Sequence, residues 1–333
     1  MAIAPPGVRR EAGRRFGPIA REAIMLIVAI VLGCLLVGWL LLNLPRRRSD
    51  GVPVRKIHPY RKMIPFLMPG RNESVVYYED VADASELEDY VARASGALGT
   101  EVDVTHCLVA ALAQALTEHP ELNRFVVGKR LYQRRRAAVT FSMKRKRLDR
   151  RAKLAAVKIR LSGAESFAEL CRLINDQVSV ERSGSKTHAD RELGLLTGLP
   201  RPLLSLGVRL LRWLDDHNLA PASFIEQDPF YASAFIANLG SLGMGAAFHH
   251  LYEYGTCPLF MMVGRIEERP AVVDGQVVVR RVLPIRWSYD ERIDDGLTAK
   301  GGMDAVRRRL EHPSTYFGDH AATSAPGARR AAA

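Results

Sequence analysis

The sequence predicts a mixed α/β domain that follows one membrane-spanning helix. Residues 23–44 are apolar apart from Asn43, and a run of this length can cross ~30 Å of hydrocarbon as a helix. The rest of the chain alternates β-branched strand patterns with segments of helical spacing, which is the pattern of helices packed on a sheet. The strand pattern 276–282 and the helix pattern 297–310 enclose the acidic turn 287–296. Such turns are places where α/β proteins aim reactive side chains.

Composition and charge narrow the classes of function. A hydrophobic fraction of 47% indicates a folded chain, and the net charge of +12 predicts an anionic partner: a phosphorylated ligand, a lipid headgroup or nucleic acid. The four cysteines, Cys34, Cys107, Cys171 and Cys257, form no Cys-x-x-Cys pair. We therefore expect neither a metal site nor a disulfide framework, and the simplest interpretation is a reducing compartment.

We interpret the apolar run as an anchor that is retained. It is longer than the ~7–15 apolar residues of a cleaved signal peptide, and no small-x-small site precedes Pro45. Basic residues flank it in the tail 1–22 and in the linker 45–56. Because both flanks are basic, the positive-inside rule gives only a slight preference between the two membrane orientations. Together with the cysteine usage, it favours a single-pass protein with a cytoplasmic C-terminal domain. The linker arginines would fix this topology or hold anionic headgroups.

Helix and strand patterns follow one another through the expected domain, residues 57–313. Helical spacing appears in the segments 84–98, 107–119 and 165–180. Thr105 is the predicted cap of the second helix, and Pro120 ends it. Strand patterns occupy 73–78, 137–143, 154–161, 230–238 and 257–266. Asp274-Gly275 between two β-branched runs predicts a type I′ hairpin. From residue 314 onward, small and polar residues indicate a disordered tail, 314–333.

Four stretches carry a resemblance to a known family. They are "LVAALAQALTEHPELN" in the second helix pattern, "ANLG" at 237–240, "GRIEERPAVVDGQVVVR" at 264–280, and Asp290 to Gly296, which is similar to the signature Asp-His-Arg-x-x-Asp-Gly. Together they resemble the acyltransferase (dihydrolipoyl transacylase) component of 2-oxo acid dehydrogenase complexes over about residues 61–313. The resemblance implies the chloramphenicol acetyltransferase-like fold, a two-layer α/β sandwich.

The resemblance also implies an assembly and a mechanism. It implies a homotrimer with an active-site channel between subunits. A histidine takes the proton of a thiol, of coenzyme A or of lipoamide, and the thiolate attacks a thioester. A serine or threonine donates to the tetrahedral oxyanion. The aspartate of the signature is structural and is held by an arginine near the start of the domain, which pairs Asp295 with Arg61 by position.

Two positions depart from the family pattern. Glu291 stands where the family has its histidine, and Ala237 where it has the oxyanion serine. A carboxylate of ordinary pKa ~4.3 is mismatched to a thiol near ~8.5 by ~4 units, or ~5.7 kcal/mol, whereas imidazole would be mismatched by ~2 units. Losing an oxyanion donor costs ~10²–10³ in rate. Ser233, Ser241 or a backbone N–H would have to replace it.

A second candidate base lies in the sequence His249-His250-Leu251-Tyr252-Glu253. One histidine, oriented by Glu253, is a chemically reasonable general base. The alternative that both histidines are packed or hydrogen-bonded structural residues has about equal weight. A metal site is the weakest interpretation, because adjacent side chains rarely converge on one ion.

Basic residues are dense between Lys129 and Arg160. The connection that contains Lys144, Arg145 and Lys146 is a candidate pocket for the phosphates of coenzyme A. A face turned to anionic lipid and a plain solvated hairpin are the alternatives. Nucleic-acid binding is disfavoured, because stacking aromatics are almost absent and no recognition motif appears.

The segment 186–229 is an insertion relative to the family. Its residues 202–214 combine leucines with spaced arginines. This basic amphipathic helix could lie in the membrane interface, cap a pocket or pack in a trimer contact. Packing is favoured, since most apolar stripes are buried in protein.

Two hypotheses follow. In the first, a membrane-anchored homotrimer transfers an acyl group between coenzyme A and an unknown acceptor, with Glu291 or His250 as base. Asn238, Ser241, Arg61 and Arg292 would position the substrate. In the second, the loss of the histidine and of the serine leaves a silent trimeric scaffold or ligand-binding protein at the membrane. The N-terminal segment lacks a lipoyl-type sequence, so we expect acyl-CoA as substrate and no attached lipoyl group.

Overall fold

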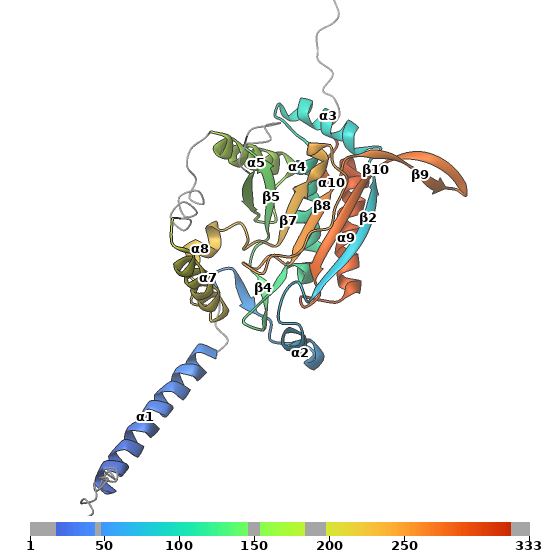
Figure 1. Cartoon of the computed structure of the whole chain (residues 1–333). Helices are drawn as coiled ribbons and strands as arrows, with labels where there is room; N and C mark the ends of the chain where they lie inside the picture. Colours follow the sequence, from blue (N-terminus) through green and yellow to red (C-terminus); the bar gives the residue numbers. More distant parts are fainter. Residues whose placement is uncertain (1–17, 44–47, 146–153, 184–197, 321–333) are drawn as a thin grey trace, which may run out of the picture. The chain divides into compact units, whose positions relative to one another are not determined.

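The computed structural model describes residues 18–43, 48–145, 154–183 and 198–320, and the chain divides into two units, Met1–Pro45 and Arg46–Ala333 (Figure 1). The first unit contains α1 (Pro18–Asn43). Its segment Glu22–Asn43 is long and apolar enough to cross a membrane, judged by length and composition. The helix therefore lies where the sequence predicts an anchor.

The second unit is built on a seven-stranded mixed sheet in the order β2-β10-β8-β7-β5-β6, with β9 paired to β10. Its strands are β2 (Val75–Asp83), β5 (Ala138–Lys144), β6 (Leu154–Arg160), β7 (Ala234–Asn238), β8 (Leu259–Val263), β9 (Glu267–Val273) and β10 (Gln276–Asp290). β7 runs parallel to both β5 and β8, and the other neighbours are antiparallel. The predicted β10 pattern ended at residue 282; the strand continues to Asp290, where the acidic turn begins.

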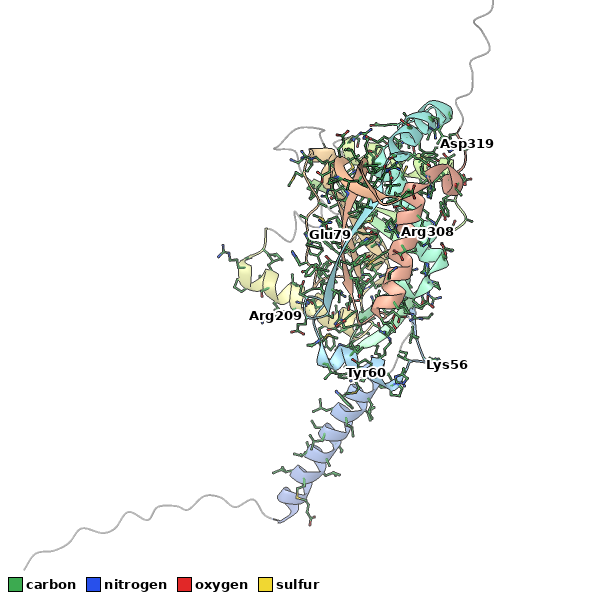
Figure 2. All side chains as sticks on the ribbon, turned by 90° about the vertical axis from the view of Figure 1, so that its right-hand side faces the viewer. Lys56, Tyr60, Glu79, Arg209, Arg308 and Asp319 are labelled. Atoms are coloured by element: carbon green, nitrogen blue, oxygen red, sulfur yellow. The ribbon has the colours of Figure 1, made fainter. Side chains whose placement is uncertain are left out.

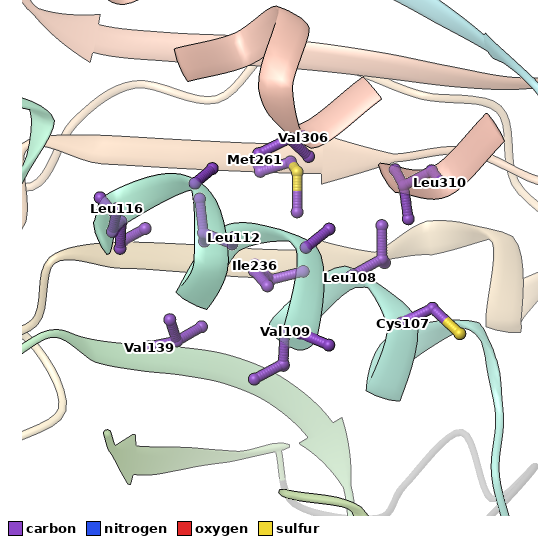
Figure 3. Packing of buried hydrophobic residues seen from close by; sticks show 14 of the residues in the cluster. Cys107, Leu108, Val109, Leu112, Leu116, Val139, Ile236, Met261, Val306 and Leu310 are labelled. Atoms are coloured by element: carbon purple, nitrogen blue, oxygen red, sulfur yellow. The ribbon is translucent and has the colours of Figure 1, made fainter. Parts of the chain in front are cut away.

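Helices form the second layer. They are α3 (Leu87–Leu98), α4 (Val104–Glu118), α5 (Phe167–Arg182), α9 (Gly296–Glu311) and the short α10 (Pro313–Phe317). Figure 3 shows Leu108 and Leu112 of α4 between Ile236 and Met261 of the sheet and Val306 of α9. All five side chains are buried, so the core lies between helices and sheet, and the predicted two-layer α/β sandwich is confirmed.

A small three-stranded sheet, order β1-β4-β3, was missed by the sequence analysis. Its strands are β1 (Gly51–Pro53), β3 (Arg124–Val127) and β4 (Arg130–Arg134). β1 lies in the predicted linker 45–56, and Arg48 is buried. Arg48 and Arg134 both pair with Asp50, at 3.0 and 3.2 Å. The linker prediction is therefore wrong for residues 48–53, because Arg48 is neutralised inside the domain and β1 joins the small sheet.

Three further local predictions can be compared with the structure. α4 is capped by Asp103 and not by Thr105: the Asp103 carboxylate accepts from two backbone N–H groups of the first turn. The tail prediction is wrong at its start, since Phe317 of α10 is buried against Tyr90 and Phe167; residues 321–333 lie outside the described part. The type I′ prediction is confirmed, because Asp274 and Gly275 both have positive φ, 50° and 77°.

The further helices α2, α7 and α8 lie outside the helical layer described above. α2 (Pro59–Leu67) precedes the large sheet. The described part of the predicted insertion, 198–229, contains α7 (Arg201–Asp216) and α8 (Ala222–Gln227). Asp215 at the end of α7 pairs with Arg48 at 2.7 Å, so α7 and the first described residues of the unit are bound to each other.

Candidate active site

The acidic turn after β10 is held by a buried ion pair. Asp290 is fully buried, and the Arg292 guanidinium contacts both of its carboxylate oxygens at 2.8 and 2.7 Å. Ser74 Oγ donates to the same carboxylate at 2.9 Å. Arg292 Nη1 also donates to the carbonyls of Met68 and Pro69, at 3.2 and 2.7 Å. The donors of Arg292 are thus engaged within the protein, so the substrate-binding role expected of it is replaced by a role in shaping the turn.

Arg61 of α2 holds the turn from its other side. Its Nη2 lies 3.3 Å from Asp294 Oδ1 and 3.8 Å from Asp295 Oδ2, and its Nη1 donates to the Glu291 carbonyl at 3.4 Å. Arg124 of β3 pairs with the other oxygen of Asp294 at 2.7 Å. The expected Arg61–Asp295 contact is present, but Asp294, which the sequence analysis did not use, is the nearer carboxylate.

Asp295 caps α9. Its carboxylate accepts from the backbone N–H of Thr298 at 3.0 Å. This hydrogen bond lowers the pKa of Asp295 below its ordinary value, and the Arg61 charge acts in the same direction. A Cβ on the next residue, Gly296, would lie 3.4 Å from Tyr289 Oη, so the glycine allows the helix to begin close to that hydroxyl.

Glu291 is the partly exposed member of this turn. Its backbone N–H donates to the Ser74 carbonyl at 3.0 Å. Among the described residues, none forms a hydrogen bond or an ion pair with its carboxylate. Burial raises the pKa of Tyr289, and the negative charges of Glu291 and Asp295 raise it further, which indicates that both carboxylates lie near the Tyr289 hydroxyl.

The candidate histidine base lacks its expected partner. Glu253 accepts from the backbone N–H groups of Arg71 and Asn72, at 3.2 and 2.9 Å, and does not orient either histidine. His249 stacks on Phe260 with ring centroids 4.2 Å apart, and its Nδ1 lies 2.6 Å from the His250 carbonyl. Burial lowers the pKa of His249. The prediction of a Glu253-oriented base is therefore wrong, because this carboxylate anchors the turn before β2.

Asn238 and Ser241 line a cavity of about 390 Å³ at the end of β7. Asn238 Oδ1 accepts from the Ser241 N–H at 3.1 Å, and its Nδ2 donates to Thr105 Oγ1 at 3.2 Å. Lys144, expected to bind coenzyme A, lines the same cavity. Arg145 is instead paired with Glu181 at 2.8 Å. Lys146 lies outside the described residues.

The cavity contains a histidine that the sequence analysis missed. His106 is buried at the start of α4, and its Nδ1 lies 2.9 Å from Asp103 Oδ1. Its Nε2 faces Asn175 Oδ1 at 3.2 Å. Asn175 Nδ2 donates to Thr100 and to the Glu101 carbonyl, which fixes the amide oxygen toward His106, so Nε2 carries the proton. The Asp-x-x-His spacing before an apolar helix was the signal available in the sequence.

Ala237, which the resemblance aligns with the family's oxyanion serine, has no hydroxyl to donate. It lies on the sheet face opposite α4, in an apolar cluster with Phe235, Phe260 and Met262. Ser233, a suggested replacement, is buried and accepts from the Ala138 N–H at 2.9 Å. The Ser241 hydroxyl donates to the Asn238 carbonyl at 2.7 Å. Of the suggested substitutes, only Ser241 lies on the cavity.

The two halves of the expected site do not share a cavity within one chain. No residue of the segment 287–296 lines the cavity of Asn238, whereas Arg292 lines a separate one of about 130 Å³. Among the residues that the structure describes, no group of three or more His, Cys, Asp or Glu side chains could hold a metal ion.

Comparisons with known proteins agree with this architecture. Residues 226–317 match the sequence model of the 2-oxoacid dehydrogenases acyltransferase (catalytic domain). The lipoamide acyltransferase component of the branched-chain alpha-keto acid dehydrogenase complex of Pseudomonas aeruginosa is 49% identical over 55 residues, which are 16% of this chain and 13% of that protein. The chain therefore matches only a small part of this curated relative.

Two solved structures show the same fold. The probable dihydrolipoamide acetyltransferase of Listeria monocytogenes is matched with a TM-score of 0.53 at 18% identity, over 78% of this chain and 94% of that one. The cubic core of a pyruvate dehydrogenase multienzyme complex gives 0.52 at 19% identity, over 80% and 95%. At these identities the likeness establishes the fold.

Proposed function

Since residues 226–317 belong to the acyltransferase catalytic-domain family of the 2-oxoacid dehydrogenases, and the unit has the corresponding fold, we propose that the protein is an acyltransferase. It transfers an acyl group between coenzyme A and a second thiol, the acceptor. It works as a homotrimer anchored by α1, with the second unit in the cytoplasm.

The observation that carries this proposal is the acidic turn. The ion pairs of Asp290, Arg292, Asp294 and Arg61 maintain its shape, and the Glu291 side chain is partly exposed. We infer from the resemblance that Glu291 takes the place of the family's histidine. Glu291 takes the proton of the attacking thiol. The thiolate adds to the thioester carbon, and the tetrahedral intermediate expels the second thiolate, which recovers the proton from Glu291.

A pKa mismatch and a missing oxyanion donor limit the rate of this reaction. An unperturbed carboxylate is mismatched to a thiol by ~4 pKa units, or ~5.7 kcal/mol. Without a serine hydroxyl at position 237, the oxyanion relies on Ser241 or a backbone N–H, and loss of one donor costs ~10²–10³ in rate. We therefore expect slow turnover compared with a histidine enzyme.

A trimer would complete the site. Glu291 and Asn238 do not line a common cavity in one chain, whereas a neighbour could bring its Glu291 to the cavity of Asn238. The hairpin of β9 and β10 supports such an assembly, because Val272, Val277 and Val279 are 73%, 74% and 70% exposed. Lys144 and Arg182 on the cavity would face the phosphates of coenzyme A.

The test uses the full chain in detergent with a panel of acyl-CoAs and a small thiol acceptor. We expect slow release of free coenzyme A that falls to background in Glu291→Gln. The matched control is Glu268→Gln, in β9 and outside the turn, which should keep the activity. The proposal would be contradicted if no acyl-CoA gave release of free thiol and none shifted the melting temperature.

A second function, a silent trimeric scaffold or ligand-binding protein, is favoured by one observation. Ala237 is packed in an apolar cluster and provides no oxyanion donor. In that case acyl-CoA would raise the melting temperature without turnover, and Glu291→Gln would leave this thermal shift unchanged.

A further inference from the structure

We propose that α7 lies on the lipid surface, as a second membrane contact in addition to α1. α7 belongs to the insertion 186–229, and Figure 2 shows it, with Arg209 labelled, at the side of the second unit. The inference rests on the membrane anchor of the proposed function. It adds a specific element and a specific partner, a bilayer containing anionic phospholipid.

α7 has an apolar stripe that no protein side chain covers in the described structure. Leu203, Leu206, Leu210 and Trp213 are 53%, 62%, 53% and 44% exposed. Their spacing of three and four residues places them on one face of the helix. Leu204, Leu211 and Leu214 lie on the neighbouring face of the helix and are partly buried. The helix is therefore attached by one apolar face and presents another.

The charges on α7 match an anionic lipid surface. Arg201, Arg209 and Arg212 are exposed along the helix. Its two acids, Asp215 and Asp216, lie in the last turn: Asp215 is buried and paired with Arg48, and Asp216 accepts from the Gly128 N–H at 3.3 Å. An apolar stripe flanked by arginines is typical of helices that lie in the headgroup region. A contact with a second copy of the chain would not require these exposed cations.

The residue that binds the end of α7 follows α1 closely in the sequence. Arg48 donates to the Asp215 carbonyl at 3.1 Å and to Asn218 Oδ1 at 3.2 Å, and it is buried over the rings of Phe125 and Tyr132. Arg48 is the fifth residue after Asn43, the last residue of α1. Five residues extend at most about 18 Å. If α1 spans a bilayer, the C-terminal end of α7 is tethered near its surface.

Tryptophan fluorescence provides a direct test on the full chain in nanodiscs of phosphatidylcholine and phosphatidylglycerol. The chain has three tryptophans: Trp39 in α1, Trp213 in α7 and the buried Trp287. In Trp39→Phe, lipids brominated at shallow acyl carbons should quench most of the Trp213 emission, because interfacial helices sit about 5–10 Å into the headgroup and acyl boundary. The double variant with Trp213→Phe should lose this quenching.

The outcomes separate α7 from the anchor. In Trp213→Phe, quenching of Trp39 by deeply brominated lipid reports on α1. Quenched Trp39 with Trp213 open to aqueous acrylamide would overturn the α7 inference and leave the anchor intact. Trp213 shielded from both lipid and acrylamide would also overturn it, in favour of a contact with a second copy. Loss of both lipid signals would contradict anchor and inference together.

A variant pair tests the stripe. Leu206→Glu with Leu210→Glu changes two exposed positions and should expose Trp213 to acrylamide and remove its quenching by lipid. Leu154→Glu is the matched control, because Leu154 is 69% exposed on β6; it should leave Trp213 quenched. Unchanged quenching of Trp213 in the double glutamate variant would overturn the inference.

Discussion

Glu291 is the residue on which the chemistry depends, because its carboxylate stands where an imidazole is expected and the surrounding ion pairs keep the turn in place. Asp294 forms ion pairs with two arginines, Arg61 and Arg124, at 3.3 and 2.7 Å. Asp290 forms an ion pair with Arg292. The turn therefore does not need Glu291 for its shape, and this position can be changed to examine the reaction separately from the fold.

Glu291→His should raise the rate of acyl transfer. The change reduces the mismatch to a thiol from ~4 to ~2 pKa units, which allows up to about 100-fold faster proton transfer. The measurement is coenzyme A release at pH 7.5 by full-length protein, with the far-UV circular dichroism spectrum as a control for folding. A rate at or below that of the unchanged protein would contradict the role of Glu291 as base.

Arg292→Met should destabilise the second unit by about 3–5 kcal/mol, because it leaves the Asp290 carboxylate buried without its cation. The control is Arg281→Met, because Arg281 is exposed and pairs with the half-buried Glu88; loss of such a surface pair costs about 0–1 kcal/mol. Urea denaturation of both variants in detergent gives the comparison. Equal costs would show that the turn does not depend on the Asp290–Arg292 pair.

At the scale of elements, α4 shows how a cap connects the core to the cavity. Asp103 ends the preceding segment, accepts from the Thr105 N–H at 2.8 Å, and contacts His106. Burial alone would raise the pKa of Asp103, but the hydrogen bonds that its carboxylate forms with His106 and Thr105 lower it overall. The start of the helix is thus stabilised by an ionised carboxylate at the wall of the cavity.

Asp103→Asn tests the pH dependence of this cap. Because the folded-state pKa of Asp103 is depressed, its stabilisation is fully present above the unfolded value of about 3.9 and is lost as the pH falls through the folded-state value. The asparagine variant keeps a cap but should lose the part of the stability that titrates below about pH 4. The melting temperature between pH 3 and 7 measures this, and identical slopes for both proteins would contradict it.

Helices and strands with clear periodicity were predictable from the sequence, whereas their partners were not. The alternation of valines around Asp274-Gly275 is a local signal, and it gave the β9–β10 hairpin correctly. β1 has three residues and pairs with β4, about 80 residues later in the chain, so no local sequence pattern predicts it. α10 was missed for the same reason, since its order depends on Phe317 meeting Tyr90 and Phe167.

The sequence identified several residues of the candidate site, but it could not predict which of their side chains contact one another. The resemblance identified Glu291, Asp295 and Arg61, which lie in one turn and its neighbour. It could not reveal that the Glu253 carboxylate accepts from the backbone N–H groups of Arg71 and Asn72. Asn72 and Glu253 are 181 residues apart, and a hydrogen bond between such distant residues produces no local sequence pattern. His106 was overlooked because its partner Asn175 comes from another helix.

At the scale of the whole molecule, the proposed trimer predicts a specific sensitive surface. Val277→Asp with Val279→Asp places charges on the exposed face of the hairpin and should convert trimers into monomers, since charged groups at an apolar interface are costly to desolvate. Analytical ultracentrifugation in detergent measures the mass of the assembly. A trimer that persists would assign the interface to another surface.

The buried pair of Arg48 with Asp215 has a consequence for shortened forms of the protein. A polypeptide that starts at residue 57, the expected domain boundary, loses Arg48 and β1 and leaves Asp215 buried among Tyr231 and the small sheet without its cation, which costs about 3–5 kcal/mol. One that starts at residue 46 retains the pair. We expect the longer fragment to express as a stable species and the shorter one to precipitate, so protease trimming at residue 56 would inactivate the protein while leaving every residue of the acidic turn in the chain.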